Sequence, residues 1–254
     1  MSLSERDVAP ITLWSPEDGV DRVLIVTAHP DDVDFGSAGS VAAFTAAGLE
    51  VTYCIVTNGD AGGSDREMSR AEMAGLRQDE QRAAAAVVGV SDVRFLGHPD
   101  GMVQATIELR RDISRVIRQV RPQRVITQSP ERNWEFIYAS HPDHMAAGEA
   151  AVCAVYPDAR NPFAHAELLE DEGLEPWTVN EIWIMGPGVP STAVAVDTTT
   201  TVEHKIAALM CHKSQLPDPD PTAERVRLWA RAAAEAAGLP EGRSAETFSV
   251  TRIP

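Results

Sequence analysis

A four-residue segment near the start of the chain combines an imidazole with two carboxylates. It reads His29-Pro-Asp31-Asp32. An imidazole and a carboxylate three residues later can both reach one zinc ion, and the adjacent carboxylate can then face the metal-bound water. The neighbouring aspartates are therefore expected to have different roles, with Asp32 on the metal and Asp31 beside the water.

A second segment, His141-Pro142-Asp-His144, repeats part of this pattern. Pro142 suits the first position of a helix, so His141 and His144 are expected about one turn apart on the same side. Either segment alone has a simpler interpretation, as a loop histidine beside a capping aspartate. Together they supply two nitrogens and one oxygen for an open catalytic zinc site, with a fourth position for water.

Both segments follow predicted strands. The first comes directly after the apolar run of residues 22–27, and the second follows a strand at 124–127 and a loop. In open α/β sheets, ligands bind beyond the carboxyl ends of the strands. The expected position and the expected chemistry therefore agree.

The rest of the chain alternates short β-branched runs with Ala-rich segments of helical period, which is typical of βα units around a mostly parallel sheet. We expect a Rossmann-like three-layer α/β/α sandwich in one domain, residues 1–254. Its catalytic core would span about 22–215, followed by a C-terminal helix and strand at about 222–254. The Pro-rich run 217–221 is expected to be a loop, because each proline removes a backbone donor. Strands are expected near 22–27, 51–57, 93–96, 124–127, 181–185 and 193–196, and helices near 39–47, 66–88, 106–120, 201–214 and 222–237.

Composition narrows the class of partner. The 254 residues are 44% hydrophobic and 24% charged, the balance of a soluble globular protein. A net charge of -16 disfavours nucleic-acid and anionic-membrane partners and favours a neutral or cationic small molecule. No signal-peptide pattern or membrane-spanning run is apparent, so the cytoplasm is expected.

Three widely spaced cysteines predict neither a disulfide framework nor a thiolate zinc site. Residues 222–237 could form a contact in a homo-oligomer.

The two motifs, in this order and context, resemble those of the PIG-L/LmbE-like zinc-dependent N-acetylglucosaminyl deacetylases. That family is marked by Ala-His-Pro-Asp-Asp after the first strand and by His-Pro-Asp-His further on, and the resemblance covers about residues 22–215. It implies that zinc is bound by His29, Asp32 and His144. Asp31 matches the general base of the family.

Further site residues follow only from this resemblance. His141 matches the proposed general acid and oxyanion stabiliser, and Asp143 matches the neighbour that tunes it. The substrate contacts that the resemblance implies are Arg77, Asp100, His212 and Gln215. Two of them have simpler interpretations: Arg77 as a solvated arginine on a helix, and His212 as a residue at a helix C-terminus.

The chain departs from the family pattern in two places. Val33 and Asp34 follow the Asp pair where many members have Glu, and this leaves the catalytic set unchanged. Ala139 stands where some members use a tyrosine to steady the oxyanion, with Tyr138 beside it.

The sequence thus predicts a zinc-dependent hydrolase that removes an acetyl group from the amide nitrogen of an N-acetylated amino sugar or its conjugate. Zinc lowers the pKa of its bound water to about 7 and polarises the carbonyl. Asp31 would take the water's proton, and either Asp31 or His141 would protonate the departing amine. Iron(II) is the alternative ion, since imidazole suits several transition metals.

Two other functions stay open. A phosphoesterase or similar metal-dependent hydrolase would need more converging carboxylates for a two-metal clamp than these motifs supply. A non-catalytic metal- or sugar-binding module would not need a second aspartate on the metal-bound water.

Overall fold

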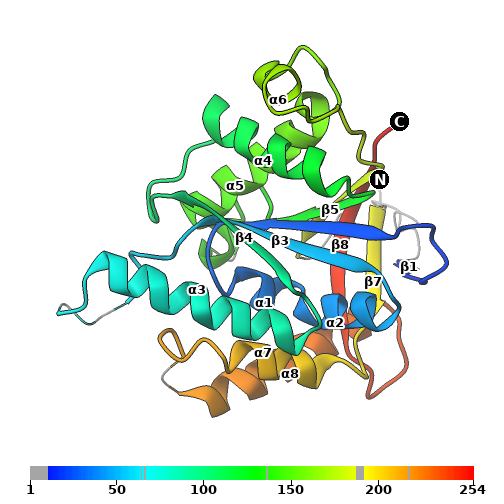
Figure 1. Cartoon of the computed structure of the whole chain (residues 1–254). Coiled ribbons are helices and arrows are strands. Elements are labelled where there is room, and N and C mark those ends of the chain that lie inside the picture. Colours follow the sequence, from blue (N-terminus) through cyan, green and yellow to red (C-terminus); the bar gives the residue numbers. More distant parts are fainter. Residues whose placement is uncertain (1–10, 64, 66, 136, 187–191, 217) are drawn as a thin grey trace, which may run out of the picture.

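The computed structural model describes residues 11–63, 65, 67–135, 137–186, 192–216 and 218–254. An eight-stranded sheet runs through these residues, and helices cover both of its faces (Figure 1). The strand order is β1-β7-β8-β6-β5-β2-β3-β4; β8 is antiparallel to its neighbours and the other pairs are parallel. This confirms the predicted α/β/α sandwich. The strands are β1 (Thr12–Leu13), β2 (Arg22–Thr27), β3 (Glu50–Thr57), β4 (Asp92–His98), β5 (Arg124–Thr127), β6 (Glu181–Met185), β7 (Ala193–Asp197) and β8 (Ala245–Arg252).

The helices divide between the two faces of the sheet (Figure 1). On one face lie α1 (Asp32–Gly36), α2 (Ala38–Ala46), α3 (Arg70–Val87), α7 (Val202–Leu209) and α8 (Pro219–Ala236). The opposite face carries α4 (Ile107–Val120), α5 (Pro142–Cys153) and the short α6 (Glu167–Glu170). A 3-10 turn (Ile137–Ser140) leads into α5, and a π turn (Ala154–Asp158) follows it.

β2 is buried on both faces because its side chains alternate between two apolar clusters. Val23 and Ile25 pack into the cluster on the α2 and α3 side, whereas Leu24 and Val26 pack into the cluster on the α4 and α5 side. The apolar run ends at the carboxyl end of the strand. The polar residues of the first motif therefore emerge at the edge where ligands bind in such sheets.

Two boundaries depart from the sequence prediction, each for a local reason. The predicted helix at 66–88 begins at Arg70, because Ser69 and Glu72 form a reciprocal capping box. The predicted loop at 217–221 is wrong in its second half, because α8 begins at Pro219. A proline in the first turn of a helix removes an N–H that has no partner within the helix. Pro217 lies outside the described residues.

Two smaller findings concern the helices and the cysteines. Within the described ranges, no helix is both long enough and apolar enough to cross a membrane. Cys54 is buried, and Cys153 and Cys211 are partly buried; all three are free thiols.

Candidate metal centre and active site

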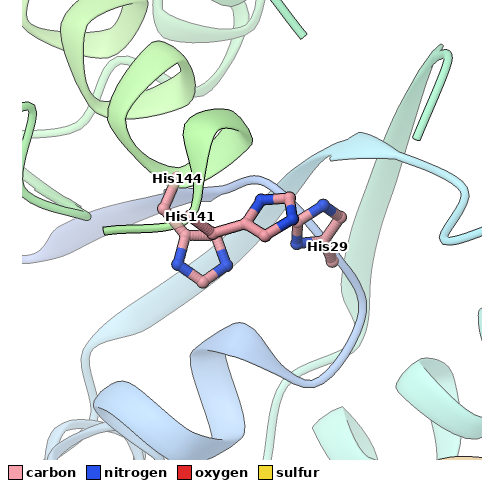
Figure 2. Close-up of side chains that lie close together, drawn as sticks. All are labelled: His29, His141 and His144. Atoms are coloured by element: carbon pink, nitrogen blue, oxygen red, sulfur yellow. The ribbon is translucent and has the colours of Figure 1, made fainter. Parts of the chain in front are cut away.

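Three histidines from the two motifs meet at the carboxyl edge of the sheet. His29 lies two residues beyond β2, while His141 and His144 belong to the start of α5 (Figure 2). The ring centroid of His29 is 5.0 Å from that of His141 and 5.2 Å from that of His144, and the latter two are 5.2 Å apart. Together these imidazoles form a group able to hold a metal ion.

Asp32 connects the two predicted histidine ligands. Its Oδ1 lies 3.0 Å from Nε2 of His144, and its Oδ2 lies 3.4 Å from Nδ1 of His29. Burial opposes ionisation of this carboxyl group, but the two imidazoles outweigh it and hold the pKa of Asp32 well below its usual range. The carboxylate is therefore ionised and available to a cation.

The other nitrogen of His29 faces two more carboxylates. Its Nε2 lies 3.1 Å from Oδ1 of Asp100 and 3.2 Å from Oδ2 of Asp143, and these three residues form a second group able to hold a cation. Burial disfavours the charged imidazole, yet hydrogen bonds with Asp100 and Asp32 raise the pKa of His29 to about 10.

Asp143 is occupied by donors on both oxygens. The N–H of Gly101 donates to Oδ2 at 2.7 Å, and the N–H of Val103 donates to Oδ1 at 3.2 Å. Its side chain is 1% exposed, and its carboxylate contacts Nε2 of His29. Its backbone N–H donates to Nδ1 of His141 at 3.2 Å, and its charge raises the pKa of His141 against the larger opposing effects there.

His141 is exposed at the N-terminus of α5, where it caps the helix through Nδ1. Partial burial and the neighbouring imidazoles of His29 and His144 lower the pKa of His141. Because Nδ1 accepts a hydrogen bond, the neutral ring carries its proton on Nε2. Tyr138, three residues earlier, is 83% exposed.

Asp31 has an unusual backbone conformation for a residue other than glycine. Its φ of 84° places it in the left-handed region at the start of α1. Burial and the charge of Asp32 raise the pKa of Asp31 to about 7, against the opposing effect of Arg77. A carboxyl group that titrates near neutral pH suits general base catalysis.

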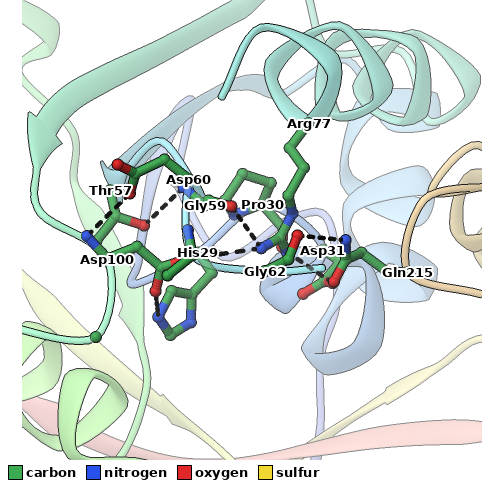
Figure 3. A network of polar contacts seen from close by, with 12 residues as sticks. His29, Pro30, Asp31, Thr57, Gly59, Asp60, Gly62, Arg77, Asp100 and Gln215 are labelled. Carbon is green, nitrogen blue, oxygen red and sulfur yellow. Dashed lines mark hydrogen bonds and ion pairs between the residues drawn. The ribbon is translucent and has the colours of Figure 1, made fainter. Parts of the chain in front are cut away.

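Arg77 is only 4% exposed and contacts three loops (Figure 3), the third through Oδ2 of Asp100, which lies 3.9 Å from Nη1. Its Nη2 donates to the carbonyl oxygen of Pro30 at 2.6 Å and to Oδ2 of Asp31 at 3.1 Å, while Nη1 donates to the carbonyl oxygen of Gly59 at 3.2 Å. A Cβ atom at Gly62 would lie 2.2 Å from Nη1, so the glycines in this loop permit its close approach to the guanidinium. Arg77 thus lies behind Asp31, and the loops enclose the guanidinium group of Arg77.

The remaining predicted substrate contacts lie at different depths. Asp100 is 8% exposed and accepts from the N–H of Ala61 at 3.0 Å, in addition to its contact with His29. His212 is completely buried, with Nε2 2.8 Å from Oδ2 of Asp34, and has no surface for a substrate to touch. Gln215 is partly buried, and its Nε2 donates to the carbonyl oxygen of Gly62 at 3.2 Å (Figure 3).

Sequence reasoning missed Gln81, which is completely buried on α3 and accepts a hydrogen bond from the N–H of Asp31 at 2.7 Å. The signal was present in the helical period, because Arg77 and Gln81 lie four residues apart on the same buried face as Ala84. Polar residues on the apolar face of a helix need partners inside the protein, and here the partners are residues of the site.

Comparison with known proteins identifies the family. The family model described as PIG-L, GlcNAc-PI de-N-acetylase, matches residues 24–155. The chain is 32% identical over 203 residues to a diacetylchitobiose deacetylase of Thermococcus kodakarensis, covering 80% of this chain and 73% of that one. It is 31% identical over 201 residues to a probable N-acetyl-alpha-D-glucosaminyl L-malate deacetylase 2 of Bacillus cereus, covering 76% and 83%.

A solved structure agrees with these matches. The N,N'-diacetylchitobiose deacetylase of Pyrococcus horikoshii, in complex with an inhibitor, superimposes with a TM-score of 0.84 at 28% identity. The match covers 94% of this chain and 87% of that chain. The resemblance inferred from the two motifs is confirmed, and the chain belongs to the PIG-L family of de-N-acetylases.

Proposed function

We propose that this protein is a metal-dependent N-deacetylase that hydrolyses the acetamide of an amino sugar or an amino-sugar conjugate. The observation that carries the proposal is the contact of one carboxylate, Asp32, with both His29 and His144. Ligand atoms bound to one zinc ion at about 2.1 Å in a tetrahedron lie about 3.4 Å from one another. The observed separations are of this size, 3.0 Å from Nε2 of His144 to Oδ1 of Asp32 and 3.4 Å from Nδ1 of His29 to Oδ2, so Asp32 lies within ligand distance of both imidazoles.

In this proposal zinc is held by Nδ1 of His29, Asp32 and Nε2 of His144, and iron(II) suits the same nitrogen and oxygen donors. Asp100 and Asp143 contact the opposite nitrogen of His29. Such outer carboxylates fix the tautomer and orientation of a ligating imidazole. A bound metal ion would supply an activated water and polarise the acetamide carbonyl.

Asp31 is the proposed general base. Arg77 holds the carboxylate of Asp31. The pKa of Asp31, about 7, leaves an ionised fraction of this group to take a proton from the attacking water at neutral pH. The same carboxyl group then returns that proton to the departing amine.

His141 is the proposed donor to the oxyanion that forms at the acetamide carbon. Its Nδ1 is used by the N–H of Asp143, so the neutral ring presents Nε2–H. Its lowered pKa favours this neutral form at neutral pH, so the ring donates a hydrogen bond without losing a proton. This assigns protonation of the amine to Asp31 rather than to His141.

The structure also bears on the two alternatives. A two-metal phosphoesterase would need a second ion in the group of His29, Asp100 and Asp143, but that group shares His29 with the proposed zinc site, and a neutral imidazole binds one ion. A binding module would gain nothing from holding a second aspartate in the left-handed region, where strain is usually retained for function.

The substrate class follows from the relatives, whose names specify diacetylchitobiose and N-acetyl-glucosaminyl malate. The test is release of free amine from N,N'-diacetylchitobiose and N-acetylglucosamine by zinc-loaded protein, with Asp31→Asn as the matched control. We expect amine release by the parent protein and none above background by the variant, with equal bound zinc. Equal rates for the two proteins would refute the assigned base. No release by zinc-loaded parent protein from any N-acetylated sugar would refute the proposed function.

A further inference from the structure

The left-handed conformation of Asp31 is held from outside its own loop. In the described ranges only Asp31, Arg121 and His165 have positive φ without being glycine. Asp31 precedes α1 but makes no side-chain cap to that helix. A strained backbone conformation persists only where the surrounding structure imposes it. Within its own helix only the carbonyl oxygen of Asp31 is held, by the N–H of Phe35 at 2.9 Å, whereas the contacts to its N–H and its carboxylate come from α3.

Gln81 supplies one of these contacts. The side chain has no exposed surface, and its two amide atoms have different partners. Oε1 accepts from the N–H of Asp31 at 2.7 Å, and Nε2 donates to Oδ2 of Asp34 at 2.9 Å. The carboxylate of Asp34 can only accept from this nitrogen, so the amide oxygen must face Asp31.

Asp34 is in turn fixed by His212. Both side chains are completely buried, and Nε2 of His212 lies 2.8 Å from the same Oδ2 that accepts from Gln81. The three polar side chains form a continuous path from the end of α7, through α1, to α3 and the peptide of Asp31. Within the described residues, Oδ1 of Asp34 and Nδ1 of His212 have no hydrogen-bond partner, so the path is held through Oδ2 of Asp34 alone. Buried polar contacts of this kind orient the groups that they join.

α3 therefore holds Asp31 at two points. Arg77 binds the carboxylate at 3.1 Å, and Gln81, one helical turn later, binds the backbone N–H. Arg77 also donates to the carbonyl oxygen of Pro30 at 2.6 Å, so Arg77 and Gln81 hold the two ends of the Pro30–Asp31 peptide. Together these contacts fix both the peptide plane and the direction of the Asp31 side chain.

We propose that Gln81, oriented by Asp34 and His212, is a positioning residue that keeps Asp31 in the left-handed conformation and aims its carboxylate into the site. This inference rests on the proposed function for its effect on turnover, because it concerns the general base assigned there. It also reassigns His212, which supports the base from behind instead of touching the substrate.

The first test is Gln81→Glu in the full-length, zinc-loaded protein with N,N'-diacetylchitobiose as the substrate. The introduced carboxylate can still accept from the N–H of Asp31, but it faces the buried carboxylate of Asp34 with like charge. We expect kcat to fall about 10- to 100-fold while KM and bound zinc change by less than about twofold. If KM rose and bound zinc fell together with kcat, or if kcat were unchanged, the proposal would be overturned.

A compensating substitution separates positioning from general damage. In the double variant Gln81→Glu with Asp34→Asn, the amide introduced at position 34 donates to the carboxylate introduced at position 81 and to the unprotonated Nε2 of His212. We expect kcat to recover to within about threefold of the parent. Gln78→Glu is the matched control, because this partly buried glutamine on the same helix only accepts from Arg82. It should leave kcat unchanged.

Crystal structures provide a readout that does not depend on turnover. Gln81→Met removes the acceptor without adding charge, and Asp31 should leave the left-handed region in this variant. In the double variant Gln81→Glu with Asp34→Asn, which keeps an acceptor at position 81, Asp31 should stay in the left-handed region. An Asp31 that keeps its parent φ in Gln81→Met would overturn the inference. A parent protein that releases no amine would refute the proposed function instead, and the conformation of Asp31 would still decide the role of Gln81.

Discussion

Asp143→Asn tests whether the outer carboxylates support the metal centre. Three donors converge on the Asp143 carboxylate: the N–H groups of Gly101 and Val103 at 2.7 and 3.2 Å, and Nε2 of His29 at 3.2 Å. Asparagine offers one oxygen and one NH₂ group, so in either amide orientation at least one donor faces another donor. The negative charge beside His29 is lost as well.

The size of the effect follows from these contacts. Removal of an outer carboxylate of this kind lowers metal affinity by about 10- to 100-fold, which corresponds to about 1.4–2.7 kcal/mol. The buried donor that is left without an acceptor costs about 1–3 kcal/mol of folding stability. Asp143 has only 1% of its surface exposed, so water cannot replace the lost acceptor.

The assay is the zinc dissociation constant of Asp143→Asn, measured by competition with a chromogenic chelator and compared with the parent protein. Asp112→Asn is the matched control, because Asp112 lies 3.3 Å from Nε2 of His98, a histidine outside the proposed metal set. We expect weaker zinc binding only in Asp143→Asn. A folded Asp143→Asn protein with parental zinc affinity would refute the role of this carboxylate as a support for His29.

Three further predictions concern the base, the packing of α5 and the effect of metal removal. Asp31→Ala and Asp31→Asn should both lose amine release by at least about 100-fold. Urea unfolding should show the alanine variant about 1 kcal/mol less stable, because asparagine tolerates the left-handed region better. Gly148→Ala should destabilise the protein by about 1–3 kcal/mol in the same assay, since its Cβ would lie 2.3 Å from the carbonyl oxygen of Gln128; Gly75→Ala, with no neighbour within 4 Å, should not. After chelation, His29 has a pKa of about 10 in the folded protein, against an ordinary 6.5. Its protonation should therefore stabilise the folded protein, and this contribution is complete below about pH 6.5. That stability should be lost as the pH rises through about 10, and urea unfolding of His29→Gln should not show this decline.

The sequence predicted the layers of the fold well because they depend on local patterns. β2 and β3 are continuous apolar runs, and the helices between the parallel strands show a clear helical period. The two-residue strand β1 and the five-residue helix α1 were missed, since elements this short carry too few residues for a period to appear. β1 exists because it pairs with β7, and α1 is held by its packing against α2 and α7.

The site was predicted unevenly, for a physical reason. The sequence brought His29, Asp32 and His144 together because strand ends in a parallel sheet share one edge. It did not distinguish a side chain that faces the substrate from one that stands behind the site, because burial is a tertiary property. Arg77 and His212 were expected to contact substrate, whereas the structure buries both behind Asp31.

The chain has three His-Pro-Asp segments, at 29–31, 141–143 and, after β4, at 98–100. They show how backbone conformation separates residues that look alike in sequence. Each follows a strand, and each brings its aspartate to the same centre, yet the aspartates have different surroundings. Asp31 sits in the left-handed region and faces Arg77, so it remains available as a base. Asp143 lies in the first turn of α5 and Asp100 in a turn after β4, and both are directed at Nε2 of His29. In the proposed function the same three letters therefore supply one base and two supports, and the surroundings differ because of the φ of Asp31 and the helix that Pro142 starts.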